Sequence, residues 1–225
     1  MDRYLLPAEQ TALLNAARWT NTPTAQRDYH LFSALILSGC RIGEFLTINV
    51  GQALAAVMGN KDYLFIPREN RKGNYTDIKI YLTKPLRTHL TALLDRHGES
   101  AEAVAPLVFG RGGQPLTVRA VQKRVKHWAK QAGIQTEVSP HWFRHTHAMN
   151  VMRTSTAKNP LQVVQRSLGQ LSISSASIYA HATREEVQAD LDRAAQVMEV
   201  GVTGKKRITL AQLRREYVNQ MEAVA

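Results

Sequence analysis

The first forty residues carry apolar side chains at helical spacing. A run of such positions follows Pro7, a residue that fits the entry of a helix better than its interior. A second segment, TAQRDYHLFSALILS at 24–38, becomes increasingly apolar and stops at Gly39, which favours a helix C-cap. The pattern predicts two opening helices, and it places Arg41 beside the end of the second.

Between Tyr63 and Leu82 the pattern changes to strands. Two short β-type runs, YLFIP and DIKIYL, are joined by the polar and basic segment RENRKGNY. We therefore expect an antiparallel β-hairpin with a cationic loop, and that loop contains Lys72.

Helical spacing returns after Pro85 in LRTHLTALLDRH, followed by a short extended piece, LVF. A helix is predicted from Thr117 through Trp128, with Gly133 near its end. The final third contains four further segments of mainly helical character, namely SPHWFRHTHAMNVMR, PLQVVQRSLG, a Ser-rich stretch and TREEVQADLDRAAQVM. The predicted fold class is α+β, mostly α-helical, with a small antiparallel β-hairpin or sheet.

The chain divides into one main domain, residues 1–200, and a basic C-terminal tail, residues 201–225. The division falls at GVTGK, which is typical of a flexible break. The tail, KKRITLAQLRREYVNQM and the residues that follow, has the composition of a small separate helix.

Composition narrows the class of partner. Of 225 residues, 29 are Lys or Arg and 18 are Asp or Glu, so the formal net charge is +11. A polyanion fits this charge, although a basic protein that merely stays soluble fits it equally.

The single cysteine, Cys40, is expected to be buried and inert, which suits a reducing cytoplasm. No stretch reaches the roughly 18 apolar residues that span a bilayer, so we expect a cytoplasmic protein with no membrane partner.

Taken one at a time, the chemically capable residues are ambiguous. Arg41 and Glu44 in SGCRIGEF lie at i and i+3, a spacing that also suits an ordinary surface ion pair. His141 and Arg144 in SPHWFRHTHA share a helical face and either grip a phosphate or form a solvated edge.

Their order and spacing are more specific. The series SGCRIGEF, RKGN, PHWFRHTHA and LGQLSISSASIYAH runs from about Ser38 to His181. Gly169 precedes Tyr179 by ten residues and Arg144 precedes it by thirty-five. This series resembles the catalytic domain of the tyrosine recombinases, the phage integrase type, in which a tyrosine cleaves DNA without a cofactor or a metal.

The resemblance implies a set of catalytic residues: Arg41, Lys72, His141, Arg144, Gln170 and Tyr179. Both arginines would clamp the scissile phosphate, since a guanidinium fork matches two phosphate oxygens. Tyr179 would form a 3′-phosphotyrosine, His141 would handle the proton, and Lys72 would protonate the departing 5′ oxygen, with Lys79 as the fallback. Glu44 is expected to orient Arg41.

Gln170 departs from the family pattern, which usually has His or Trp after LG. A glutamine donates a hydrogen bond to a phosphate oxygen but can neither carry charge nor shuttle a proton, so a slower enzyme is expected. A zinc site on His141, His145 and His147 is a rival reading; Arg144 in the same run opposes a cation, and we expect His145 and His147 to pack or hydrogen-bond around the helix.

The resemblance implies a site-specific recombinase that acts on double-stranded DNA with a specific recombination site, for integration, excision, inversion or multimer resolution. A homotetramer at synapsis is implied, accessory DNA-binding proteins are possible partners, and the tail would dock on DNA or on a neighbouring protomer. Two rivals remain open: a DNA-binding accessory protein that has lost turnover, and a type IB topoisomerase-like enzyme. Most members carry a core-binding domain before this one, so the chain is either a short form or a fragment.

Overall fold

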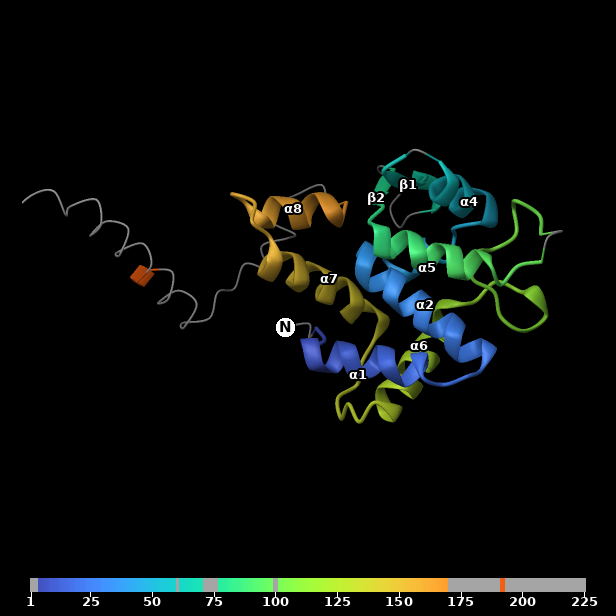
Figure 1. The fold of residues 1–225 in the computed structure, drawn as a ribbon, viewed down its shortest axis with the longest axis horizontal. Coiled ribbons are helices and arrows are strands. Elements are labelled where there is room, and N and C mark those ends of the chain that lie inside the picture. The colour runs from blue at the N-terminus through green and yellow to red at the C-terminus, as the bar shows by residue number, and fades with distance from the viewer. Residues whose placement is uncertain (1–3, 60, 71–76, 99–100, 170–190, 193–225) are drawn as a thin grey trace, which may run out of the picture. The chain divides into compact units, whose positions relative to one another are not determined.

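The computed structural model describes residues 4–59, 61–70, 77–98, 101–169 and 191–192. Two compact units, residues 1–180 and 181–225, divide the chain, and the elements below belong to the first (Figure 1). Its helices and strands are α1 Pro7–Arg18, α2 Pro23–Ser38, α3 Ile42–Phe45, α4 Val50–Met58, β1 Tyr63–Ile66, β2 Ile78–Tyr81, α5 Lys84–Leu94, α6 Val118–Gln131, α7 Pro140–Thr154 and α8 Pro160–Ser167. The mostly helical fold with a small antiparallel sheet is confirmed.

The predicted helices that fall within the described residues begin and end close to their expected residues, whereas those expected after Gly169 lie almost entirely outside the described residues. In α2 the Thr22 side chain accepts a hydrogen bond from the Ala25 amide, and the helix ends at Gly39 with φ +61°. That left-handed conformation is one that glycine adopts without strain. Helix α6 continues to Gln131, three residues past the predicted Trp128, and Gly133 follows with φ +72°.

The predicted hairpin is also confirmed. Strands β1 and β2 are antiparallel, with Leu64 opposite Ile80 and Ile66 opposite Ile78. These four side chains are buried, while Phe65 and Lys79 point outward, as the two-residue period of a strand requires. The loop segment 71–76, and with it Lys72, lies outside the described residues.

The sequence pattern did not indicate α3 and α4. Helix α4, VGQALAAVM, is apolar on most positions, so its helical period is masked. The readable signal was its capping box, in which Asn49 and Gln52 exchange side-chain and backbone hydrogen bonds at 2.8 and 3.0 Å. The predicted extended LVF piece is not a strand: the chain bends at Leu107 and Val108 between isolated β-bridges at Pro106 and Phe109, and Leu107 donates its amide to the Ile48 carbonyl.

Helix α2 lies at the centre of the main core, where it contacts α1, α5 and α7 (Figure 1). A smaller apolar cluster lies between α7 and α8 and contains Ala148, Val164 and Leu168. Among the described residues, no helix combines the length and the apolar character needed to cross a membrane.

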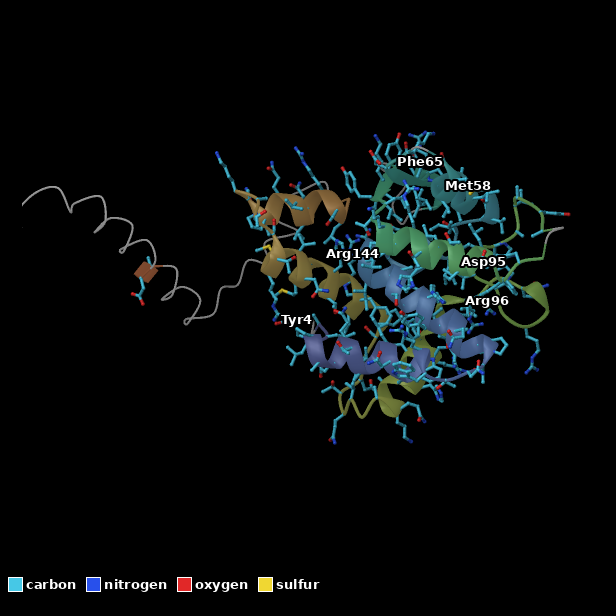
Figure 2. The ribbon with its side chains drawn as sticks, in the orientation of Figure 1. Tyr4, Met58, Phe65, Asp95, Arg96 and Arg144 are labelled. Atoms are coloured by element: carbon cyan, nitrogen blue, oxygen red, sulfur yellow. The ribbon has the colours of Figure 1, made fainter. Side chains whose placement is uncertain are left out.

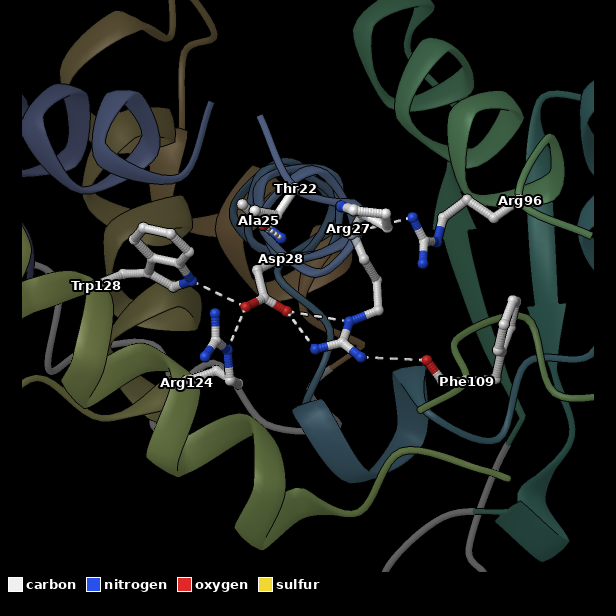
Figure 3. A network of polar contacts seen from close by, with 9 residues as sticks. Thr22, Ala25, Arg27, Asp28, Arg96, Phe109, Arg124 and Trp128 are labelled. Carbon is white, nitrogen blue, oxygen red and sulfur yellow. Dashed lines mark hydrogen bonds and ion pairs between the residues drawn. The ribbon is translucent and has the colours of Figure 1, made fainter. Parts of the chain in front are cut away.

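A buried carboxylate joins the start of α2 to α6 (Figure 3). Asp28 is fully buried and accepts from Arg27 at 3.0 and 2.6 Å. Its second oxygen accepts from Arg124 at 2.5 Å and from the Trp128 indole at 2.8 Å. Because a buried charge is tolerated only with such partners, this network fixes α6 against α2.

Candidate functional site

A cavity of about 500 Å³ opens where the end of α2 meets α3, α6 and α7. It is lined by Cys40, Arg41, Ile42, Gly43, Glu44, Val118, Gln122, Ser139, Pro140, His141 and Arg144. Three residues that the sequence singled out separately, Arg41, His141 and Arg144, therefore border one space.

Arg41 enters the cavity from the junction after α2. It is the N-cap residue of α3, and its side chain is 43% exposed. Its Nη1 donates to Oε1 of Glu44 at 3.1 Å, and Glu44 is buried. The pair is therefore not an ordinary surface ion pair: a buried carboxylate holds one side of a guanidinium that reaches the cavity.

Cys40, next to Arg41, is buried as predicted. Burial raises the pKa of its thiol, and the nearby Glu44 carboxylate raises it further. Since the thiolate is the reactive form, this cysteine is inert under ordinary conditions.

Arg144 lies in the interior, where α7 approaches α2 (Figure 2). Only 3% of the residue is exposed. Its Nη1 donates to the Gly39 carbonyl at 2.8 Å and its Nη2 to the Leu168 carbonyl at 3.0 Å. These carbonyls end α2 and α8, so the guanidinium is oriented by the negative ends of two helix dipoles.

His141 lies in the first turn of α7 and is exposed. Its ring meets that of His145 edge to face, with centroids 4.5 Å apart. The first turns of α6 and α7 both border the cavity, and helix N-termini favour anions. With two arginines beside them, the arrangement is suited to bind a phosphate.

His147 serves the packing around this site. Its Nδ1 donates to the Ile36 carbonyl at 2.9 Å, and its Nε2 lies 3.0 Å from the Ser167 hydroxyl. Burial lowers its pKa, which favours the neutral ring. The prediction that His147 hydrogen-bonds around the helix is confirmed. In the part of the chain that the structure describes, no three potential metal-binding side chains gather at one point.

The remaining predicted site residues, Lys72, Gln170 and Tyr179, lie outside the described residues. Lys79, the fallback lysine, is exposed on β2 with its ammonium 4.7 Å from the centroid of the Tyr63 ring. Of the described residues that line the cavity, none comes from the hairpin.

Sequence reasoning missed the contribution of α6. Val118 and Gln122 line the cavity, although the sequence indicated only that Val121 and Val125 face the core. The available signal was their position: they occupy the first two turns of the helix and lie beside Val121 and Val125, at the edge of the side that faces the core.

Solved structures share this architecture. The crystal structure of XerA recombinase matches with a TM-score of 0.68 at 21% identity, over 86% of this chain and 66% of that chain. XerH site-specific recombinase, in a pre-cleavage complex with its difH substrate, matches with a TM-score of 0.62 at 19% identity, over 84% and 54%. The fold is therefore that of the catalytic domain of tyrosine recombinases.

The sequence agrees with this assignment. The Phage integrase family model matches residues 3–186, and the chain belongs to that family. Tyrosine recombinase XerC of Neisseria gonorrhoeae is 29% identical over 157 residues, which are 70% of this chain and 48% of the relative. The chain thus spans about half the length of this curated relative.

Proposed function

We propose that this chain is the catalytic domain of a site-specific DNA recombinase, which cleaves and rejoins DNA through a 3′-phosphotyrosine at Tyr179. The observation that carries the proposal is the convergence of Arg41, His141 and Arg144 on one cavity. Family membership and the spacing from Arg144 to Tyr179 support the same chemistry.

Each residue takes a defined part in the step. The Tyr179 oxygen attacks phosphorus, the bond from phosphorus to the 5′ oxygen breaks, and Lys72 gives that oxygen a proton. His141 takes up the tyrosine proton, since a hydroxyl with a pKa near 10 needs assistance at neutral pH. Arg41 and Arg144 stabilise charge on the non-bridging oxygens, and Gln170 donates a hydrogen bond there.

The bond energy is conserved in this scheme. The phosphotyrosine retains a phosphodiester, so a 5′ hydroxyl from a partner duplex reverses the step without ATP. None of the residues assigned to the step requires a metal ion or a cofactor.

A second candidate function is a DNA-binding accessory protein that retains the fold without turnover. Gln170 favours it, because this position usually carries a residue that completes the phosphate site in the family. That reading predicts DNA binding with no covalent adduct.

The test is a covalent trapping assay. DNA flanking the protein's own gene is mixed with the full chain in excess EDTA, quenched with detergent, and assayed for protein attached to DNA. Wild type is compared with Tyr179→Phe, which removes only the attacking oxygen. Tyr81→Phe is the matched control, because Tyr81 is an exposed tyrosine on β2 outside the cavity.

We expect an adduct with wild type and Tyr81→Phe, and none with Tyr179→Phe. Specific DNA binding without an adduct would favour the accessory protein. Equal adducts from all three proteins would refute Tyr179 as nucleophile. Relaxation of supercoiled DNA by a monomer, with no strand exchange, would favour a type IB topoisomerase-like enzyme.

The partners follow from the same scheme. We propose that residues 1–200 act on duplex DNA at a specific recombination site in the cytoplasm, as a homotetramer at synapsis, with accessory DNA-binding proteins as further partners. The net charge of +11 supports a polyanionic substrate. The basic tail, residues 201–225, would dock on DNA or on a neighbouring protomer. Sedimentation of the free protein and of its complex with DNA would compare the number of protomers in each assembly.

A further inference from the structure

The turn that ends α8 packs directly against the hairpin. Gly169 has φ +61°, and a Cβ atom added there would lie 2.6 Å from both Cδ1 and Cγ1 of Ile78. Ile78 is the first residue of β2, is only 2% exposed, and pairs with Ile66 of β1. Backbone and strand side chain therefore meet at a distance that leaves no room for a methyl group.

The same turn holds the phosphate-binding arginine. The residue before Gly169 is Leu168, whose carbonyl accepts from Nη2 of Arg144 at 3.0 Å. Leu168 is fully buried in the cluster between α7 and α8. Two consecutive residues thus contact Arg144 on one side and β2 on the other.

The hairpin depends on such contacts for its position. A two-stranded sheet is marginal by itself and takes its orientation from what it packs against. Here α4 packs on β1, and α8 packs on β2. The Ile78 contact is the point at which the hairpin meets the turn that also holds Arg144.

We propose that Gly169 and Ile78 are positioning residues, whose close contact sets the hairpin against the phosphate clamp. The inference rests on the proposed function, in which Lys72, six residues before Ile78, protonates the departing oxygen. A general acid works only within hydrogen-bond reach of its target. A displacement of β2 would therefore impair proton delivery while leaving Arg41 and Arg144 able to bind the phosphate.

The decisive measurement compares two DNA substrates. One carries the ordinary scissile phosphodiester, and the other has sulfur in place of the bridging 5′ oxygen. Cleavage of the first needs a proton on the leaving oxygen. The second releases a thiolate, which leaves without one because a thiol has a pKa of about 8.5. The ratio of the two rates therefore reports proton delivery.

The main variant is Gly169→Ala in the full chain. Gly133→Ala is the matched control, because Gly133 also follows a helix end with positive φ but has nothing within 4 Å of the added Cβ. We expect Gly169→Ala to slow the ordinary substrate about 10- to 100-fold and the sulfur substrate by less than about threefold. Gly133→Ala should leave the ratio unchanged.

Three further variants keep the test decisive. Adding Ile78→Ala to Gly169→Ala removes both colliding carbons, so part of the lost rate should return. Ile78→Ala alone loosens the contact without backbone strain and should shift the ratio in the same direction, so it replaces Gly169→Ala if that variant does not fold. Lys72→Ala removes the proposed acid, so it gives the largest change in the ratio of the two cleavage rates that a loss of proton delivery can cause.

The outcomes separate the two proposals. If Lys72→Ala is rescued by sulfur but Gly169→Ala and Ile78→Ala slow both substrates equally, the positioning role is wrong and the proposed function stands. If Lys72→Ala slows both substrates equally, the role of Lys72 is wrong and the inference falls with it. A wild type that cleaves neither substrate overturns the proposed function itself.

Discussion

The two ends of α2 each gather arginines, yet they are built differently. At the start, Arg27 and Arg124 close around the Asp28 carboxylate, which is fully buried (Figure 3). At the end, Arg41 and Arg144 border a cavity of about 500 Å³. Glu44 contacts Arg41 from the side, and two carbonyls orient Arg144 from behind.

The difference separates arginines that join helices from arginines that border an open cavity. Where a carboxylate occupies the centre of the cluster, it neutralises the guanidinium charges, and the ion pairs hold the helices together. Where a cavity occupies the centre and the partners lie behind the guanidinium groups, the same residue type presents charge to an outside anion. Net charge alone does not distinguish the two, because both ends are basic.

The largest predicted effect comes from breaking the closed cluster. Asp28→Ala leaves the buried Arg27 guanidinium, the partly exposed Arg124 guanidinium and the Trp128 indole without the carboxylate that they share, and it should lower the free energy of unfolding by about 3–5 kcal/mol. Urea denaturation measures this loss. A change below about 1 kcal/mol would mean that the network contributes no stability.

Breaking the open cluster should affect catalysis instead. Arg41→Lys keeps the charge beside Glu44 but loses the planar fork, so cleavage should slow about 10²- to 10³-fold. The free energy of unfolding should change by less than about 1 kcal/mol, because the side chain is 43% exposed. Arg124→Lys, at the other end of α2, is the control and should alter stability but not the cleavage rate.

A histidine pair near the closed end gives a pH-dependent effect. Nδ1 of His30 in α2 lies 2.9 Å from Nδ1 of His89 in α5. Burial, and then the charge of His30, lowers the pKa of His89 to about 4. The unfolded state binds the extra proton below a pH of about 6.5, so stability is full above that pH and declines as the pH falls toward 4.

Because His89 is only half-buried, its share of this loss should be about 1 kcal/mol. His89→Gln keeps a donor for His30 and does not titrate. Urea unfolding at pH 7 and pH 5 should show a weaker pH dependence in the variant, with His30 and His147 responsible for the remainder. An unchanged pH dependence would rule out His89 as a contributor.

The smallest effect is expected for an ion pair on the outside of α6. Lys126 Nζ lies 3.1 Å from Oε1 of Glu137, and these side chains are 58% and 87% exposed. Lys126→Ala should change the free energy of unfolding by less than about 0.5 kcal/mol, because solvent screens the pair. A loss of 1 kcal/mol or more in the same denaturation assay would contradict the distinction between buried and exposed pairs.

Local pattern was enough for much of the fold. Helix caps such as Gly39, the alternation around Lys79 and the apolar spacing of α6 are short-range signals, and each appears in the structure near its expected place. Helix α4 was missed because an almost uniformly apolar stretch has no polar face to reveal its period.

By itself, the sequence determined the fold class and the family resemblance, because helical periods and motif spacing are local properties of the chain, and the resemblance then pointed to Arg41, His141 and Arg144 as a set. The tertiary structure alone decided that α6 walls the cavity, that Asp28 ties α2 to α6, and that Gly169 meets Ile78. Such contacts join residues about ninety positions apart, as from Asp28 to Arg124 and from Ile78 to Gly169. They arise from how helices and strands fill a common core, where shape and packing rather than local propensity select the neighbours.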